Sequence, residues 1–358
     1  MENVLDFFNN RRVLITGHSG FKGSWLTLWL QKMGANVFGY SLDIPTQPSL
    51  FEELRLNNEI ITYWADINRQ EYLKFIINKN NIELVFHLAA QALVIEGIEN
   101  PQYTFQTNAM GTASVLEAVR SCPSVEATVI ITSDKCYQPN ASGHYKETDP
   151  LGGNDPYSAS KACAEIITNA YRETYKLNMA TARAGNVIGG GDWQKHRLIP
   201  DIIQSITSNQ DIVLRYPQAI RPWQFVLEPL FGYLQLGMEL YSNSNHRQAY
   251  NFGPNADRQL FTVHDITSKI VEMWGDEYKN EIVIRGTQHI ETGMLRIDST
   301  KAKRTNSGSL GWKQILTTEE ALQKTIDWYK LYYQGNTDMK EFSLKQIQEY
   351  ENRLKNED

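Results

Sequence analysis

The chain has 358 residues and a mass of 41.1 kDa, enough for one large domain or two ordinary ones, each with its own apolar core. A net charge of −6 and a pI near 5.7, without a long basic cluster, argue against a nucleic acid or an anionic membrane as partner and favour a small polar ligand. The three cysteines are odd in number and lack ligand spacing with histidine, so neither a disulfide framework nor a metal site is predicted.

The sequence also predicts a location. No apolar run approaches the roughly 18 residues of a membrane span. Residues 1–12 mix acids, asparagines and aromatic residues and lack the pattern of a signal peptide. We therefore expect a cytoplasmic protein in a reducing compartment.

The first 185 residues alternate between strand-like and helix-like segments, which is typical of a parallel sheet covered by crossover helices. Strands are predicted at residues 12–16, 36–40, 60–63, 84–88, 127–133 and 179–183. Helices are predicted at residues 24–33, 69–80, 104–121 and 157–176. The fold class is therefore α/β, with a Rossmann-type, doubly wound parallel sheet.

The composition of the sequence changes after residue 185. Glycine-rich and proline-punctuated stretches with shorter elements predict a smaller, mixed C-terminal lobe over residues 186–335, with the segment of about 220–255 returning to the first domain. Residues 336–358 form a charged tail with helical potential, and we expect a solvated terminal helix or a contact arm.

A glycine-rich loop follows the first strand and opens the first helix. Absent β carbons let backbone amides approach a pyrophosphate, and the helix N-terminus adds partial positive charge. An ordinary tight turn is the alternative, but the strand–turn–helix context favours dinucleotide binding. The loop residues expected to bind are Gly17, Ser19, Gly20, Phe21 and Gly23. Lys22 is expected to be a solvated residue of the first helical turn.

Acidic residues follow the second and third strands. Asp43 is placed to accept hydrogen bonds from the adenine ribose and would repel a 2′-phosphate, which favours NAD over NADP; the alternative is an acidic turn residue before Pro45. Asp66 and Ile67 could face the adenine, although Asp66 could instead cap the next helix.

Tyr157 and Lys161 open the helix that follows the fifth strand, and their spacing places both on one helical face. A tyrosine with a pKa near 10 is a poor base, but an adjacent ammonium and a positive nicotinamide favour the phenolate. Tyr157 could then take a hydroxyl proton. Such a pair is common on surface helices, and only the preceding strand and the glycine loop make it a catalytic candidate.

The fifth strand delivers Ser133, Asp134 and Lys135 to the carboxyl edge of the sheet, where ligands of open α/β folds bind. A simple dehydrogenase needs the hydroxyl but has no evident use for the acid and the amine. The alternative is a solvated turn with an Asp–Lys ion pair.

At these residues the chain resembles the extended short-chain dehydrogenase/reductase family, over about residues 11–328. The resemblance rests on the glycine loop, Asp43, His-Leu-Ala-Ala-Gln at 87–91, Asn108, Tyr157 and Lys161. Longer strings resemble, more narrowly, the CDP-glucose 4,6-dehydratase family: they lie at 17–25, 132–137, 189–193, 197–201 and 221–224. The Asp134–Lys135 pair discriminates, because the related dTDP-glucose dehydratases carry Asp-Glu there and epimerases carry other residues.

The resemblance implies an NAD-dependent lyase that converts CDP-glucose to CDP-4-keto-6-deoxyglucose. Tyr157, held by Lys161 and helped by Ser133, would deprotonate the C4 hydroxyl during oxidation. Water would then leave across C5 and C6, with Asp134 as the acid and Lys135 as the candidate base, before reduction at C6. Lys135 can act as a base only when it is neutral.

The resemblance also implies contacts, domains and partners. NAD contacts are implied at Ala89, Ala90, Gln91, Asn108, Thr132, Tyr157 and Lys161, and substrate contacts at Asn186, Arg197, Leu198, Arg221 and Asn251. Residues 1–185 would bind NAD and residues 186–335 mainly the sugar nucleotide. Members of the family are commonly homodimers, and deoxysugars of lipopolysaccharide O-antigen are a natural pathway.

Several alternatives stay open at this point. An epimerase would need Tyr157 and Lys161 but not the Asp134–Lys135 pair, and an NAD-binding regulatory subunit would keep the glycine loop without needing Tyr157. Two positions also depart from the CDP-glucose pattern: Ile95 replaces a basic residue and Phe225 replaces a histidine. The nucleotide base and the hexose therefore stay open.

Overall fold

The computed structural model describes residues 2–242, 244–254, 260–275, 281–286, 293–304 and 310–356. Short parts of the predicted smaller lobe and the last two residues of the predicted tail lie outside the described residues. Within the described part of the chain, no helix is both long enough and apolar enough to cross a membrane.

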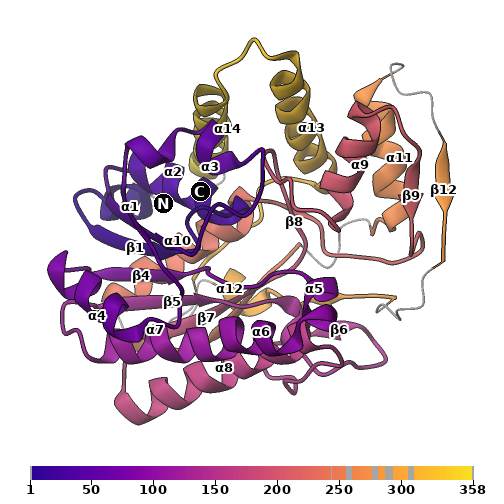
Figure 1. Ribbon diagram of the computed structural model, residues 1–358. Coiled ribbons are helices and arrows are strands. Elements are labelled where there is room, and N and C mark those ends of the chain that lie inside the picture. Colours follow the sequence, from indigo (N-terminus) through magenta and orange to yellow (C-terminus); the bar gives the residue numbers. More distant parts are fainter. Residues whose placement is uncertain are drawn as a thin grey trace.

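A parallel sheet of seven strands forms the centre of the molecule, in the order β11-β7-β5-β4-β1-β2-β3 (Figure 1). The six predicted strands are all present, and a seventh comes from the segment expected to return to this domain. The order changes direction between β1 and β4, so the carboxyl ends of these two strands flank a switch point where ligands of such folds bind. The strands are β1 (Arg12–Thr16), β2 (Asn36–Ser41), β3 (Ile61–Trp64), β4 (Leu84–His87), β5 (Ala127–Ile131), β7 (Met179–Ala184) and β11 (Ala249–Phe252).

Helices cover both faces of this sheet, which explains why β4 and β5 are continuous runs of buried residues. Successive side chains of β1 alternate: Val13 and Ile15 belong to one apolar core, whereas Leu14 belongs to the other. The first core includes α2 (Phe21–Lys32) and α10 (Leu227–Ser242), and the second includes α4 (Gln70–Lys79) and α7 (Gly111–Arg120). The predicted Rossmann-type fold class is confirmed.

The helix predicted at residues 104–121 is interrupted in the structure. It consists of α6 (Pro101–Phe105), a π-helical turn η2 (Gln106–Met110) and α7. A π turn adds a residue to the helix locally and is frequent at functional sites. Here it contains Asn108, whose side chain is 2 % exposed and points toward α8 (Pro156–Tyr175).

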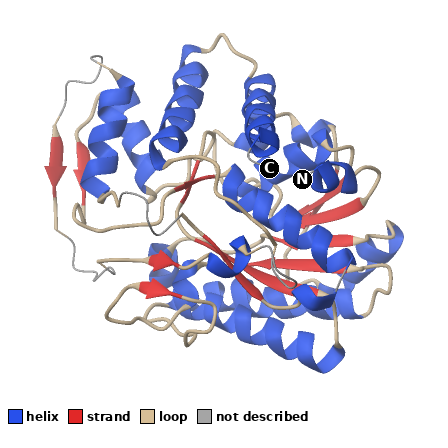
Figure 2. Ribbon diagram, turned by 180° about the vertical axis from the view of Figure 1, so that it is seen from behind, coloured by secondary structure: helices blue, strands red, loops and turns tan. Residues whose placement is uncertain are grey.

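Smaller elements complete the fold, and three two-stranded sheets, all parallel, pair segments distant in sequence. Figure 2 shows α9, α11, β9 and β12 grouped at one side of the molecule, apart from the central sheet. The three sheets pair β8 (Val187–Ile188) with β10 (Gln224–Phe225), β9 (Ile212–Leu214) with β12 (Ile282–Ile284), and β6 (His144–Tyr145) with β13 (Arg296–Ile297). The other helices are α1 (Glu2–Phe7), α3 (Leu50–Glu53), α5 (Val94–Glu99), α9 (Leu198–Thr207), α11 (Val263–Trp274), α12 (Thr300–Lys303), α13 (Thr318–Gln334), α14 (Met339–Asn356) and the short turns η1 (Leu56–Asn58), η3 (Asp134–Cys136) and η4 (Ser244–His246).

The charged C-terminal segment does not extend into solvent. Helix α14 packs against α2 and α13, and Tyr350 donates a hydrogen bond of 2.9 Å to Glu228 on α10. Trp29 on α2 donates a hydrogen bond of 2.9 Å to Glu351. The buried face of α14 repeats every three to four residues, as expected of a packed amphipathic helix: Met339, Ser343, Gln346, Ile347, Tyr350 and Leu354.

Candidate active site

The glycine loop has the geometry of an anion cradle. Gly17 has φ +73°, and a β carbon on it would lie 2.7 Å from the backbone N of Ala89; one on Gly23 would lie 2.1 Å from the Gly17 carbonyl oxygen. The chain's own packing thus requires these two glycines. A β carbon on Gly20, however, would meet only the Gly17 carbonyl oxygen, at 3.5 Å, so the protein leaves open space there. The missing side chain of Gly20 fits a ligand that approaches closely.

The first turn of α2 completes this cradle. Among the described residues no side chain caps the helix, and its first turn carries no acid. Free N–H groups at a helix N-terminus bind anions. Residues of the loop, including Phe21 at the start of α2, therefore fit the pyrophosphate of NAD.

His18, which was not predicted as a site residue, anchors the glycine loop to the two neighbouring strands. Its Nδ1 lies 2.8 Å from the Ser41 hydroxyl and its Nε2 lies 3.2 Å from the Thr62 hydroxyl. Burial lowers the pKa of His18 to about 4, so the imidazole is neutral. A β carbon on Gly39 would lie 2.3 Å from this ring, which explains the glycine in β2. The Ser19 hydroxyl also turns inward, donating a 2.6 Å hydrogen bond to the backbone of Asp43.

The two predicted acidic residues differ in their surroundings. Asp43 is exposed, and within the described residues its carboxylate accepts no hydrogen bond, so it is open to the ribose hydroxyls. Oδ1 of Asp66 accepts hydrogen bonds from the backbone N and the side chain of Asn68, at 2.8 and 2.9 Å, so this residue caps the turn before α4, one of the two alternatives. Ile67 is buried against Gly111.

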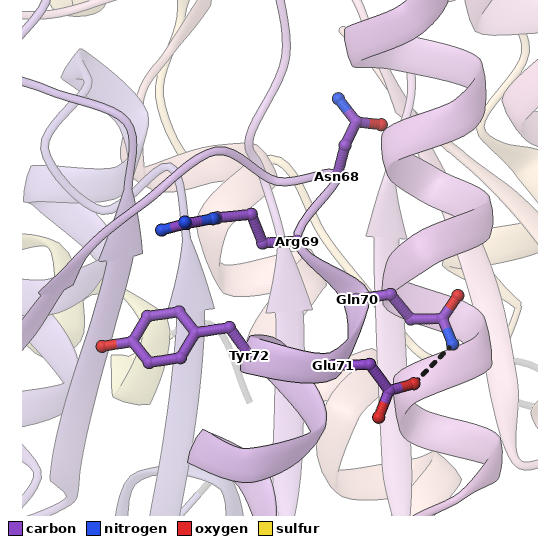
Figure 3. A pocket seen from close by; sticks show the side chains of 5 residues that line it. All are labelled: Asn68, Arg69, Gln70, Glu71 and Tyr72. Carbon is purple, nitrogen blue, oxygen red and sulfur yellow. Dashed lines mark hydrogen bonds between the residues drawn. The ribbon is translucent and has the colours of Figure 1, made fainter.

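Beside Asp66, an open hollow of about 580 Å³ lies at the start of α4 (Figure 3). Arg69 and Tyr72 extend from the helix in the same direction, while Gln70 donates a hydrogen bond of 3.3 Å to Glu71 on the other side. The residues that line this hollow, 68–72, include none of the predicted site residues.

Asn108 and Gln91 hold the loop after β4. Asn108 accepts a 2.8 Å hydrogen bond from the backbone N of Gln91 and donates to the Gln91 carbonyl oxygen and the Ser160 hydroxyl, at 2.9 and 2.8 Å. The Gln91 amide donates to the Thr104 hydroxyl at 2.8 Å, and the backbone N of Ala89 donates to the Thr16 hydroxyl at 3.2 Å. The amide hydrogens of Asn108 are thus engaged inside the protein. The side chain of Asn108 therefore positions residues 89–91, including Ala90, and the implied contact with NAD stays a prediction.

Thr132 directs its hydroxyl into the protein interior. Its side chain is 4 % exposed, and its hydroxyl donates a hydrogen bond to the Glu165 carboxylate. The implied contact of Thr132 with NAD stays a prediction.

The end of β5 and the start of α8 bring the predicted catalytic residues together. Ser133 donates a hydrogen bond of 3.1 Å to Oδ1 of Asp134 and accepts one from the backbone N of Lys135. Asp155 caps α8, accepting a 2.9 Å hydrogen bond from the Ser158 backbone. This start of the helix places Tyr157 beside Ser133, and one turn later Lys161 donates a 3.3 Å hydrogen bond to the Ile131 carbonyl oxygen.

Burial and neighbouring charges shift the pKa values of the ionisable residues in this cluster. Burial raises the pKa of Tyr157 to about 12, while Ser133 and the cation of Arg197 act in the opposite direction. Burial lowers the pKa of Lys161 to about 8. Burial also raises the pKa of Asp134 above its usual value, and its Oδ2 has no hydrogen-bond partner among the described residues. Asp134 is therefore suited to hold and deliver a proton.

Lys22 lies beside this cluster, contrary to the expectation of a solvated residue. Burial and the cations of Lys161 and Arg197 together lower its pKa to about 7, whereas Asp134 opposes them. The side chain of a residue in the first turn can point inward or outward, and only the fold decides which. No sequence signal other than the position between Gly20 and Gly23 could have found it.

Two of the five predicted substrate residues, Arg221 and Arg197, act electrostatically on the cluster. Arg221 is 6 % exposed and its guanidinium acts on Asp134. Arg197 pairs with Asp192 at 3.1 Å, just before Leu198 opens α9 and packs against the large core. Asn186 is half-buried, and its carbonyl oxygen accepts a 3.0 Å hydrogen bond from the Gln224 backbone.

Asn251, the fifth, is corrected. It is fully buried in β11, where Oδ1 accepts a hydrogen bond of 2.6 Å from Tyr137 and Nδ2 donates to the carbonyl oxygens of Tyr145 and Asp298, at 3.3 and 3.1 Å. These partners engage both amide hydrogens, so the side chain is structural and the implied substrate contact does not match the structure.

The two departures from the family pattern differ in importance. Phe225 is fully buried in the large core, with its ring centroid 6.4 Å from that of Trp25. Ile95 is half-buried in α5, a helix that packs on α8. In the same helix, a β carbon on Gly97 would lie 3.1 Å from the backbone N of Tyr157. Of the two departures, only Ile95 therefore lies in a helix that packs on the catalytic helix.

Comparison with known proteins identifies the family. The family model described as GDP-mannose 4,6 dehydratase matches residues 14–325. The chain belongs to this family. It is 44 % identical over 357 residues to the CDP-glucose 4,6-dehydratase of Salmonella typhimurium, covering 96 % of this chain and 97 % of that protein. It is 26 % identical to the dTDP-glucose 4,6-dehydratase of Xanthomonas campestris, covering 88 % of this chain and 92 % of that protein.

Solved structures share the fold of this dehydratase. The UDP-glucose 4-epimerase of Thermotoga maritima, solved with UDP-glucose, has a TM-score of 0.79 at 22 % identity and covers 90 % of this chain and 99 % of that one. A dTDP-glucose 4,6-dehydratase of Streptomyces venezuelae, solved with NAD bound, has a TM-score of 0.75 at 22 % identity and covers 89 % and 97 %. The prediction of an NAD-dependent sugar-nucleotide 4,6-dehydratase, a hydro-lyase, is confirmed. Among the described residues, no group of three or more His, Cys, Asp or Glu side chains could hold a metal ion.

Proposed function

We propose that this dehydratase converts CDP-glucose to CDP-4-keto-6-deoxyglucose. One observation carries the proposal: Asp134 and Lys135 stand at the end of β5, beside Tyr157 and Lys161. A relative named CDP-glucose 4,6-dehydratase, 44 % identical over nearly the whole chain, supports this substrate. The half-buried Ile95 beside the catalytic helix keeps another nucleotide sugar as the alternative.

The first step is removal of the proton from the C4 hydroxyl. Tyr157 takes this proton as a phenolate, which the Lys161 ammonium and the Ser133 hydroxyl stabilise. When bound in the glycine-loop cradle, NAD would supply the hydride acceptor of the oxidation and the hydride donor of the later reduction. Asp43 would accept hydrogen bonds from the adenine ribose of NAD and so position the cofactor.

The second step removes water across C5 and C6. The ketone at C4 acidifies the C5 hydrogen, and Lys135 is the candidate base, a role that requires its neutral amine. Asp134 gives its proton to the departing C6 hydroxyl. The raised pKa and the unpartnered Oδ2 of Asp134 support this role.

Cationic residues around the cluster would hold the nucleotide diphosphate. Arg221 and Arg197 can each make bidentate contacts with phosphate oxygens, with Asn186 and Leu198 beside them. Residues 1–185, with the segment of about 220–255, would thus form the NAD-binding domain, and residues 186–335 mainly the sugar-nucleotide lobe.

The dehydratase would act as a cytoplasmic homodimer. Helices α5, α6, η2 and α8 pack on one another, and they expose large apolar side chains: Ile98, Tyr103, Phe105, Met110 and Ile166. Exposed apolar patches of this kind mark interfaces between protein chains. Light scattering of the purified protein tests this assembly, and a monomer at micromolar concentration would contradict it.

The test of the reaction uses solvent deuterium oxide. CDP-glucose incubated with the NAD-loaded protein should give a 4-keto-6-deoxy product with deuterium at C5, detected by NMR and mass spectrometry. An unlabelled ketone, or an epimer alone, would rule out the mechanism. A parallel panel of CDP-, dTDP-, UDP- and GDP-sugars identifies the base and the hexose.

A further inference from the structure

Glu165 lies on the catalytic helix but has no role in the reaction described so far. It follows Lys161 by four residues and Tyr157 by eight, so the three side chains share one face of α8. Glu165 is 4 % exposed. A carboxylate is rarely buried to this extent without a compensating partner, because burial of an unpaired charge is costly.

The Glu165 carboxylate joins two strands of the central sheet. It accepts hydrogen bonds from the hydroxyl of Thr132, just past the end of β5, and from the Thr181 hydroxyl on β7, the latter at 2.7 Å. Arg183, also on β7, donates a charged hydrogen bond of 2.7 Å to the same carboxylate. Since Thr132 directly precedes Ser133 and Asp134, this contact fixes the start of the catalytic turn.

The network extends beyond the carboxylate. Arg183 also donates a hydrogen bond of 2.8 Å to the Tyr137 hydroxyl, which in turn donates to Asn251, while Nε of Arg183 has no hydrogen-bond partner among the described residues. Three donors, from Thr132, Thr181 and Arg183, engage both oxygens of the Glu165 carboxylate. Glu165 is therefore held at a fixed place relative to Lys161.

The charge of Glu165 bears on Lys161. Burial lowers the pKa of Lys161 to about 8, and the groups that oppose this are Cys136 on η3 and Glu165. Burial keeps the pKa of the Cys136 thiol well above its usual value, so the thiol is neutral and supplies no anion near pH 7. Glu165 is then the charged partner that remains.

The other titratable groups near Lys161 do not replace it. His87 on β4 faces Lys161, and burial lowers its pKa to about 3, so it is neutral. Lys22 on α2 also acts on Lys161, and as a second cation it can only favour the neutral amine there. Neither group can hold a proton on Lys161.

We propose that Glu165 is a positioning residue of this dehydratase: its carboxylate keeps Lys161 protonated and fixes Thr132 beside the catalytic acid. The proposal rests on the proposed function of Tyr157 and Lys161. A neutral amine at position 161 would not stabilise the Tyr157 phenolate, and C4 oxidation would slow.

The test is Glu165→Gln, which removes the charge and keeps the size and hydrogen-bonding capacity of the side chain. The titration of Lys161 is followed in the cofactor-free protein by NMR of lysine labelled with ¹³C at Cε, assigned with Lys161→Arg. The midpoint should fall by about one pH unit, equivalent to a tenfold change in the equilibrium. In the NAD-loaded protein, the limb of the pH profile of C4 oxidation that Lys161 sets should move down equally, and the rate at pH 7.5 should fall about threefold.

Two further variants are the controls. Thr181→Val removes one hydrogen bond to Glu165 and leaves every charge in place, so Lys161 should titrate as in the wild type. Glu165→Asp keeps the charge, so the titration midpoint of Lys161 should stay close to its wild-type value. If the unpaired Arg183 prevents Glu165→Gln from folding, Glu165→Gln/Arg183→Gln leaves no unpaired charge and should still lower the midpoint, by less than Glu165→Gln does, because it also removes the cation that lies 2.7 Å from Glu165.

A wild-type midpoint for Lys161 in folded Glu165→Gln, or in the double variant, would overturn the proposal. If the Lys161 midpoint falls but the pH profile of C4 oxidation does not change, Glu165 does not affect the catalytic step. That result would also overturn the proposed role of Lys161. Because the NMR titration needs neither NAD nor substrate, it is independent of whether CDP-glucose is the correct sugar nucleotide.

Discussion

Ser133 donates a 3.1 Å hydrogen bond to Oδ1 of Asp134, whereas Oδ2 of the same carboxyl has no partner among the described residues. The oxygen that lacks a partner is the one free to carry and release a proton. Burial raises the pKa of Asp134, so the protonated form persists at higher pH than for an exposed aspartate. The arrangement separates the acid of the elimination step from Tyr157, the base of the oxidation step.

Asp134→Asn should therefore separate the two steps. The variant should form enzyme-bound NADH from CDP-glucose but lose water at least about 100-fold more slowly, since an amide cannot give up a proton. Absorbance of NADH in a stopped-flow experiment and product NMR measure the two events. Asp327→Asn on α13 is the matched control and should behave as the wild type. Wild-type turnover by Asp134→Asn would remove Asp134 from the mechanism.

Gly20 and Gly23 should respond differently to alanine. A β carbon at Gly20 meets open space, so Gly20→Ala should keep its thermal stability and bind NAD at least about tenfold more weakly, a loss of about 1.4 kcal/mol. A β carbon at Gly23 would lie 2.1 Å from the Gly17 carbonyl oxygen, so Gly23→Ala should lower the melting temperature even without NAD. Calorimetric titration and thermal melts distinguish the two. Unchanged NAD affinity in Gly20→Ala would contradict the cradle.

The sequence predicted the sheet well because each strand is a short apolar run bounded by turn residues. Boundaries of the strands agree within one or two residues, and β5 ends early because Ser133 starts the turn η3. The catalytic pairs were also predictable, since their spacing along one helix or at one strand end already places them together.

The partners of polar side chains were not predictable. Asn108, Thr132 and Asn251 have side chains that could bind a ligand, yet the structure engages each of them in the protein interior. The chemical type of a side chain determines which hydrogen bonds it can donate or accept, but only the packing of the fold determines its partner. For the same reason Lys22, which was expected in solvent, lies beside the catalytic cluster. The buried face of α14 was also not predicted, because many residues of this helix are charged.

His18 should make stability depend on acid. Its pKa is lowered to about 4 from an ordinary value of 6.5, so the neutral form stabilises the fold above pH 6.5 and this contribution is lost as the pH falls toward 4. One such histidine should cost about 2 kcal/mol between pH 7 and pH 5. Urea denaturation should show a shallower pH dependence for His18→Gln over this range. An identical slope in the variant and the wild type would show that His18 is not neutral in the folded protein.

The C-terminal helix should contribute to global stability through Tyr350. Its hydroxyl donates a hydrogen bond to Glu228, a buried carboxylate that also accepts from the backbone N of Ile315 and of Leu316. Tyr350→Phe removes one donor from a buried charge and should lower the free energy of unfolding by about 1–3 kcal/mol. Tyr333→Phe, which alters a ring that is 45 % exposed, is the matched control and should change it by less than about 0.5 kcal/mol. Equal, small effects of the two substitutions in urea denaturation would mean that α14 is not part of the cooperative unit.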